Sequence, residues 1–267
     1  MPSLYLKNHK GFIRWNSIGT SGPTVVWLPG IGFPAVGNFL NTVADPALPP
    51  MRALMIDPLG AGDSDPIAGL SITDHADTIA DVLDHLGTGP CHVIGYSMGG
   101  AIAAELTLRR PDLVSRLILA EGNLLTGGGP RTRDMAALSV SEFRDRYLPQ
   151  RLDDLRHGAM AGDVISDFIL ASWGRTDATT LHGMAQASVA LRHTLAAEIF
   201  ALSLPRTFIF GADNTAEPGT PASKNLPEPD DLRAAGFTVL EMAGAGHDLM
   251  LTNPSGFAAL IAPALTP

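Results

Sequence analysis

Residues 95–100 read Gly-Tyr-Ser-Met-Gly-Gly and separate two stretches of different character. The apolar run Cys91–Ile94 before them is typical of a buried strand, and Ala101–Leu106 after them is typical of a helix. A serine between two glycines at a strand-to-helix turn is the pattern of a nucleophile elbow. Glycine is needed where the chain turns too tightly for a Cβ atom. We therefore expect Ser97 to lie in a strained turn with its hydroxyl exposed.

The composition is that of one globular and rather apolar chain. Its 267 residues, 45% hydrophobic and 17% charged, are enough to bury a large core. The net charge of −9 argues against nucleic acid and anionic membranes as partners. The single cysteine, Cys91, excludes a disulfide framework, and the N-terminus has no apolar signal-peptide core. We expect a cytoplasmic protein, a monomer or a homodimer, that acts on a small molecule.

Apolar runs that are typical of buried strands alternate with helical patterns along most of the chain. This alternation predicts an α/β fold with a mostly parallel sheet covered by helices on both faces. An N-terminal hairpin is expected at residues 4–7 and 11–18. Further strands are expected at 24–28, 53–57, 91–94, 117–120, 207–211 and 238–242.

The alternation of strands and helices is interrupted after Glu121. The three glycines at 127–129 indicate a hinge, and helical patterns without strands follow. We therefore predict a core domain, residues 1–123 and 203–267, with an inserted helical cap, residues 124–202. The helices expected in the cap cover 139–147, 152–160, 162–173 and 179–200.

His247 is the candidate base for Ser97. A serine hydroxyl is a poor nucleophile until a base takes its proton and a third group orients that base. Among eight histidines, His247 lies in the glycine loop Gly244–Asp248, directly after the last predicted strand. Because the carboxyl ends of parallel strands share one edge of the sheet, Ser97 and His247 should face the same crevice.

Two carboxylates compete for the role of the orienting acid. Asp213 follows the strand that ends at Gly211, and Glu121 ends the strand after the elbow. A charge at a buried strand tip is costly unless it has a partner. The separation between Ser97 and Glu121 suits one helix and one strand, which would place Glu121 on the neighbouring strand. We favour Glu121 and keep Asp213 as the alternative.

The oxyanion that forms in acyl transfer needs two preset hydrogen-bond donors. One candidate is the N–H of Met98, directly after the nucleophile. The other is the N–H of Ile31, in the loop Pro29–Gly32 after the strand at 24–28. The apolar side chains expected to border the substrate are Phe33, Leu124, Trp173 and Met250.

The segment Gly30–Ala35 also matches G-x-G-x-x-A, a dinucleotide-binding pattern, with Asp57 at the spacing of a ribose-binding carboxylate. However, Pro34 lies where the helix should begin, and this interpretation leaves the serine, the glutamate and the histidine without a role. No metal-ligand spacing and no phosphate-binding loop occurs. We expect an enzyme that needs neither a cofactor nor a metal.

The chain resembles the α/β-hydrolase superfamily in four places: the elbow, Gly246-His247, Gly30-Ile31 and the loop Asp57–Asp65. The resemblance covers nearly the whole length outside the insertion. It implies an eight-stranded, mostly parallel sheet with the cap inserted after strand six. Haloalkane dehalogenases of this fold can carry the acid after strand six, where Glu121 falls. The fold itself does not fix the substrate.

The sequence predicts a serine hydrolase that cleaves a small or medium-sized apolar ester, lactone or related acyl compound. Ser97 would attack, His247 would transfer the proton, and Glu121 would orient His247. Two alternatives stay open. One is a binding protein or receptor of the same fold with little turnover, and the other is an enzyme that uses the triad for acyl transfer or carbon–carbon bond hydrolysis.

Overall fold

A single eight-stranded sheet organises the computed structural model, which describes residues 1–212 and 226–266. The order is β1-β2-β4-β3-β5-β6-β7-β8. The pairs β1·β2 and β2·β4 are antiparallel and every other neighbouring pair is parallel, so the predicted sheet is confirmed. The strands cover Ser3–Leu6 (β1), Gly11–Ile18 (β2), Thr24–Leu28 (β3), Arg52–Asp57 (β4), Cys91–Tyr96 (β5), Val114–Ala120 (β6), Arg206–Gly211 (β7) and Thr238–Met242 (β8).

Helices cover both faces of the sheet, which is why the central strands are apolar throughout. Alternate residues of β3 belong to two different apolar clusters, because successive strand side chains point to opposite faces. Val26 packs with residues of the two helices on one face, and Trp27 packs with residues of the two helices on the other. These helices are α2 (Ile72–Leu86) and α3 (Met98–Arg109) on the first face, and α1 (Ala35–Val43) and α13 (Pro254–Leu265) on the second.

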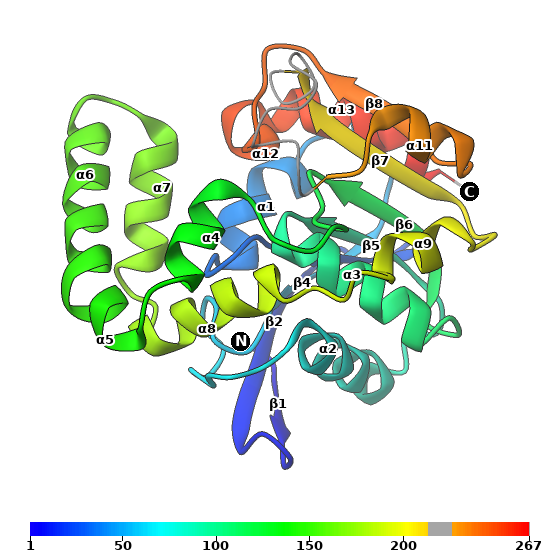
Figure 1. Ribbon diagram of the computed structural model, residues 1–267. Helices are drawn as coiled ribbons and strands as arrows, with labels where there is room; N and C mark the ends of the chain where they lie inside the picture. The colour runs from blue at the N-terminus through cyan, green and yellow to red at the C-terminus, as the bar shows by residue number, and fades with distance from the viewer. Residues whose placement is uncertain (213–225, 267) are drawn as a thin grey trace.

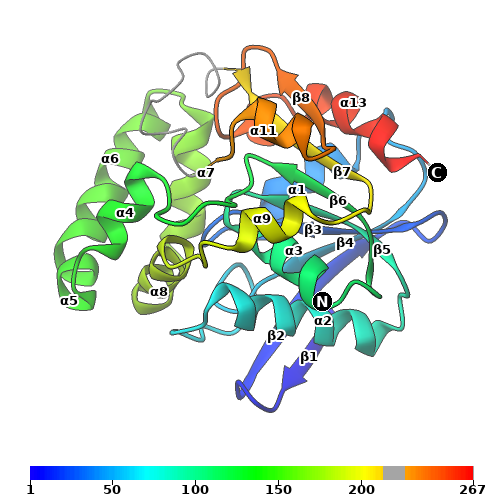
Figure 2. The ribbon, with the colours of Figure 1, turned by 45° about the vertical axis from the view of Figure 1, so that its right-hand side comes forward.

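The chain between β6 and β7 is helical, as the sequence predicts. Figures 1 and 2 both show α6 and α7 side by side, with α6 at the edge of the molecule that is farther from the sheet. The elements are α4 (Pro130–Ala136), α5 (Val140–Glu142), the π-helical turn η1 (Phe143–Tyr147), α6 (Leu148–Met160), α7 (Val164–Trp173), α8 (Ala178–Val189) and α9 (Leu195–Phe200).

The single helix predicted over 179–200 is wrong, because α8 ends at Val189 and α9 begins at Leu195. The carbonyl of Val189 accepts a hydrogen bond from the Gly127 N–H (3.0 Å), so it does not continue the helical pattern. This bond fastens the end of α8 to the glycine segment that leads out of the sheet. The bond joins residues that are far apart in the sequence, so the helical periodicity of residues 179–200 could not indicate it.

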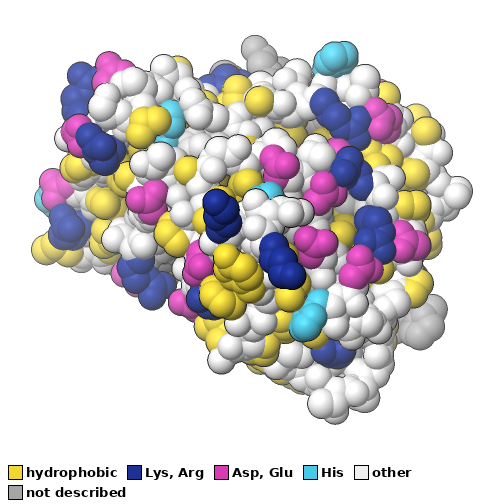
Figure 3. Space-filling model, turned by 90° about the horizontal axis from the view of Figure 1, so that it is seen from below, with side chains coloured by type: hydrophobic (Ala, Val, Ile, Leu, Met, Phe, Trp, Pro, Cys, Tyr) yellow, Lys and Arg dark blue, Asp and Glu magenta, His cyan; other side chains and the backbone are white. Residues whose placement is uncertain are grey.

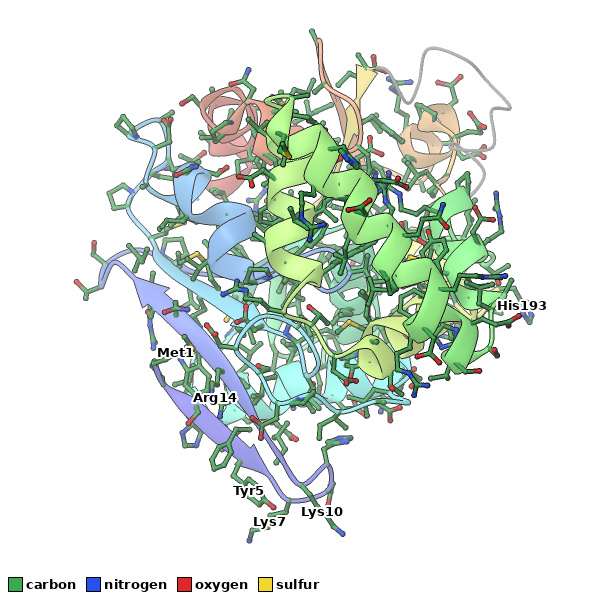
Figure 4. The ribbon with its side chains drawn as sticks, turned by 90° about the vertical axis from the view of Figure 1, so that its left-hand side faces the viewer. Met1, Tyr5, Lys7, Lys10, Arg14 and His193 are labelled. Carbon is green, nitrogen blue, oxygen red and sulfur yellow. The ribbon has the colours of Figure 1, made fainter. Side chains whose placement is uncertain are left out.

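The predicted N-terminal hairpin, β1 and β2, projects below the body of the molecule (Figure 2). Figure 4 shows Tyr5, Lys7 and Lys10 at its projecting end. Seen from below, acidic, basic and apolar side chains are interspersed on the surface (Figure 3). None of the helices in the described part of the chain is long and apolar enough to cross a membrane. The described residues also form the helices α11 (Pro229–Ala234) and α12 (Leu249–Thr252).

Candidate active site

Ser97 joins β5 to α3 in a backbone conformation that is rare for a residue with a side chain. Its φ is 52° and its ψ is −117°. The Ser97 N–H donates to the carbonyl of Ala120 (3.1 Å), and the Ser97 carbonyl accepts from the N–H of Asn123 (3.1 Å) and of Gly100 (2.9 Å). Bonds to the neighbouring strand end therefore hold the turn in place.

Close backbone approach explains the glycines of the elbow. A Cβ atom on Gly99 would lie 2.2 Å from the carbonyl oxygen of Leu28. A Cβ atom on Gly100 would lie 2.4 Å from the Cα of Gly122. Both neighbours are backbone atoms of adjacent loops or strands, so they have little room to move. The glycines let α3 start directly against the sheet edge, which aims the serine at the crevice.

Hydrogen bonds link Ser97 to His247 and His247 to Glu121. The distance from Ser97 Oγ to His247 Nε2 is 3.1 Å, and that from His247 Nδ1 to Glu121 Oε2 is 3.3 Å. With Nδ1 protonated, the histidine donates to the carboxylate and accepts from the serine hydroxyl. The structure therefore brings together the nucleophile, base and first-choice acid that the sequence indicates.

Glu121 is fully buried and has a left-handed backbone, with φ at 51°. Its N–H donates to the carbonyl of Ile209 (2.9 Å), and its Oε1 accepts from the N–H of Gly211 (2.6 Å). Because β6 and β7 are parallel neighbours, an acid at the end of β6 reaches the position next to the end of β7. Asp213, the alternative acid, lies outside the described residues.

The pKa of His247 is raised above its ordinary value. Burial on its own lowers the pKa, but the hydrogen bond and charge of Glu121 and the charge of Asp248 outweigh it. Arg131 opposes them and lowers the pKa. The side chain is 42% exposed towards the cavity, so solvent moderates all these effects.

We expect the pH profile to report this balance. A general base must be neutral, so kcat/KM should fall as the pH drops through the His247 pKa, with a midpoint above 6.5. Glu121→Gln removes the main cause of the increase and should move the midpoint to lower pH. The measurement is kcat/KM from pH 5 to 9. A wild-type midpoint below 6.5, or an upward shift in the variant, would contradict this interpretation.

The two candidate oxyanion donors come from the start of α3 and from the loop after β3. The N–H groups of Met98 and Ile31 donate to no other group within the described ranges. Ile31 lies in a turn closed by the Phe33 N–H on the Gly30 carbonyl (3.1 Å). Trp173 Nε1 donates to the Ile31 carbonyl (3.0 Å), so a residue of α7 fixes the orientation of this turn.

The dinucleotide-binding interpretation of Gly30–Ala35 is wrong. The glycines form the turn before α1, and that helix begins only at Ala35 with Pro34 as its N-cap. Asp57 is almost fully buried, and its carboxylate accepts from the N–H of Ala35 (2.6 Å) and of Asp63 (2.8 Å). It therefore holds two loops together and offers no free oxygen for a ribose.

A cavity of about 300 Å³ opens at Ser97 and His247. Phe33 and Trp173, two of the residues expected to border a substrate, line this cavity. Leu124 and Met250 do not line it, although they are buried in the apolar core as Phe33 and Trp173 are. The other lining residues are Ile31, Tyr96, Asn123, Gly129, Pro130, Arg131, Thr132, Met135 and Asp248.

The sequence reasoning missed a link between the residues next to the nucleophile and the base. The buried Tyr96 hydroxyl donates to Asp248 Oδ1 (2.6 Å), and the rings of Tyr96 and His247 lie 5.2 Å apart. Burial first, then the charge of Asp248, raises the pKa of Tyr96, so the hydroxyl remains a donor. The adjacency of Tyr96 to Ser97 and of Asp248 to His247 was the available signal.

Within residues 1–212 and 226–266, no three His, Cys, Asp or Glu side chains gather into a group that could hold a metal ion. Among the described residues that line the cavity, those with ionisable acidic or basic side chains other than Tyr96 are His247, Asp248 and Arg131. The arrangement offers a nucleophile, a base, a buried acid and two backbone donors. These are the elements of acyl transfer.

The sequence profile of the α/β hydrolase fold family matches residues 23–156. This is half of the chain and includes the elbow. The chain belongs to the α/β hydrolase family.

Curated relatives match a little more than half of the chain. The 2-hydroxy-6-oxononadienedioate/2-hydroxy-6-oxononatrienedioate hydrolase of Burkholderia vietnamiensis is 33% identical over 148 residues, which is 54% of this chain and 51% of the relative. The Escherichia coli protein of the same name is 29% identical over 148 residues, 54% of this chain and 51% of the relative. The chain spans about half the length of the curated relatives it matches.

Solved structures match the whole fold at low sequence identity. A hydrolase from Pseudomonas aeruginosa superimposes with a TM-score of 0.77 at 19% identity, covering 100% of this chain and 98% of the other. An enol-lactonase from Burkholderia xenovorans superimposes with a TM-score of 0.75 at 18% identity, covering both chains fully (100% each). At these identities, the likeness shows the fold alone.

Proposed function

We propose that the chain is a serine hydrolase with Ser97 as nucleophile, His247 as base and Glu121 as acid. The observation that supports the proposal most strongly is a continuous chain of hydrogen bonds. It runs from Ser97 through His247 to the fully buried carboxylate of Glu121. A buried carboxylate is costly to maintain unless it has such partners. Family membership and the cavity at the serine support the same conclusion.

In the proposed mechanism, His247 Nε2 takes the hydroxyl proton of Ser97 as the oxygen attacks the substrate carbonyl. The imidazolium that forms is stabilised by Glu121 and then gives its proton to the leaving group. Water, activated by the same histidine, cleaves the acyl-enzyme. The tetrahedral intermediates would place their oxyanion between the N–H groups of Met98 and Ile31.

We propose that residues 124–202 act as the cap over this site. Trp173 and Met135 reach the cavity from α7 and α4. Pockets for small molecules begin at about 300 Å³, so the cavity suits a small or medium-sized substrate. Most of the surface that lines the cavity is apolar, which favours a substrate whose acyl group is mainly hydrocarbon.

The reaction we favour is hydrolysis of an ester or lactone. Names of structural neighbours, such as the enol-lactonase of Burkholderia xenovorans, are consistent with this chemistry. A second candidate is hydrolysis next to a ketone, because the curated relatives are named for unsaturated oxo-diacids without an ester bond. Breaking such a bond is carbon–carbon hydrolysis, and the same nucleophile and oxyanion donors would serve it.

A substrate panel distinguishes these reactions and the remaining alternatives. It would contain p-nitrophenyl esters, lactones and 1,5-diketones, each with and without an acceptor alcohol. Product carrying the alcohol would indicate acyl transfer. One slow turnover with retained product would indicate a receptor-like protein.

We expect a fluorophosphonate to label the protein stoichiometrically at Ser97. The probe reacts with a serine only when a base activates it and an oxyanion site receives the phosphonyl oxygen. Intact-mass spectrometry would measure the adduct, and Ser97→Ala is the matched control. Labelling that persists in Ser97→Ala would refute the nucleophile assignment.

A further inference from the structure

Arg131 is a cation at the cavity for which the proposed mechanism has no use. It is the second residue of α4 and lines the same cavity as Ser97 and His247. Its guanidinium forms no hydrogen bond and no ion pair with any residue in the described ranges. By contrast, the neighbouring Arg133 donates to the carbonyl of Gly128 (2.8 Å).

Within the described residues, the two acids beside His247 already have partners. Asp248 accepts from the Tyr96 hydroxyl, and Glu121 faces His247. On its outer side, Arg131 borders a shallow groove with Asp134, Asp154 and Arg151, and none of these forms an ion pair with it in the described part of the chain. The five N–H donors of a guanidinium match a carboxylate well, so an unoccupied one at a substrate cavity is suited to a ligand.

We propose that Arg131 is a specificity-determining residue that binds a carboxylate on the substrate, so that the preferred substrates are small acyl compounds with an apolar body and one anionic end. This inference rests on the proposed function and names its substrate class. A single guanidinium suits a monoanion. The apolar walls formed by Phe33, Met135 and Trp173 suit the hydrocarbon between the anion and the reacting carbonyl.

Electrostatics at the base support this role. The positive charge of Arg131 lowers the pKa of His247, against Glu121 and Asp248, which raise it. An uncompensated cation therefore disfavours the imidazolium that forms when Ser97 attacks. A substrate carboxylate on Arg131 would neutralise this charge, so an anionic substrate would also assist proton transfer.

The test compares two esters of equal length, mono-p-nitrophenyl glutarate and p-nitrophenyl valerate, which differ only in a terminal carboxylate or methyl group. The readout is the ratio of their kcat/KM values. Because Arg131 is exposed to solvent, which weakens its ion pairs, Arg131→Gln should lower the ratio only about tenfold, mostly through KM. Arg131→Lys keeps the charge and should lower it less. Arg146→Gln, which removes an exposed arginine outside the cavity, should leave the ratio unchanged.

A binding measurement separates this inference from the proposed function. Calorimetry on Ser97→Ala would compare 5-phenylvalerate with its uncharged amide. The carboxylate should bind about tenfold more tightly, and Arg131→Gln should abolish the difference. An equal affinity, or a preference that survives Arg131→Gln in a folded protein, would overturn the anion site. Absence of Ser97-dependent turnover of both esters would overturn the proposed function instead.

Discussion

His247→Ala should lower kcat by about 10⁶-fold. His247 Nε2 lies 3.1 Å from Ser97 Oγ and is the base to which the hydroxyl can pass its proton. Without it, the serine remains a neutral alcohol and the leaving group lacks an acid. The measurement is kcat on a p-nitrophenyl ester, with the melting temperature as a check that the variant folds.

The matched control for His247→Ala is the double variant with Ser97→Ala. Groups that act as one unit lose their effect together, so the double variant should be no slower than either single variant. Losses that multiply would mean that the two residues act independently. Such a result would contradict the proposed triad.

Glu121→Gln should lower kcat by about 10⁴-fold. Glutamine keeps an oxygen for the Gly211 N–H, so the end of β7 remains bonded. Its amide, however, presents a donor to His247 Nδ1 at 3.3 Å and favours the tautomer with the proton on Nε2. That tautomer cannot accept the proton of Ser97. The measurement is kcat together with the pH profile.

Asp213→Asn is the control for the choice of acid. We expect it to change kcat far less than Glu121→Gln does. If Asp213→Asn costs about 10⁴-fold and Glu121→Gln leaves kcat within a few-fold, the acid assignment is wrong. A similar large loss in both variants would mean that the two carboxylates act together.

Local pattern predicted the central strands β3 to β7 well because they are buried on both faces and therefore carry nearly continuous apolar runs. The elbow was readable for a similar reason, since Gly99 and Gly100 are required by backbone atoms within a few ångströms. The placement of Glu121 followed from the cost of a charge at a strand tip. The position of the Glu121 side chain also depends on the parallel pairing of β6 with β7, because this pairing places the ends of the two strands side by side.

The walls of the cavity were harder to predict. Phe33 and Trp173 line it, but Leu124 has the same apolar character and is buried in the core. Hydrophobicity cannot distinguish a core side chain from a pocket side chain, because both avoid water. Arg131 escaped notice since a charged residue at a helix start is ordinarily solvent-exposed, and only the tertiary arrangement brings it to Ser97.

The bond from Trp173 to the Ile31 carbonyl also constrains how this protein can diversify. In many enzymes, the residues that determine substrate specificity and the residues that catalyse the reaction can change independently. Here one indole both borders the cavity and orients the turn that carries an oxyanion donor. Natural or laboratory evolution that replaces Trp173 to admit a new substrate would also alter turnover, because the turn that carries the Ile31 N–H would lose its hydrogen bond. Adaptation would therefore proceed through paired changes, the second restoring the turn that the first disturbed.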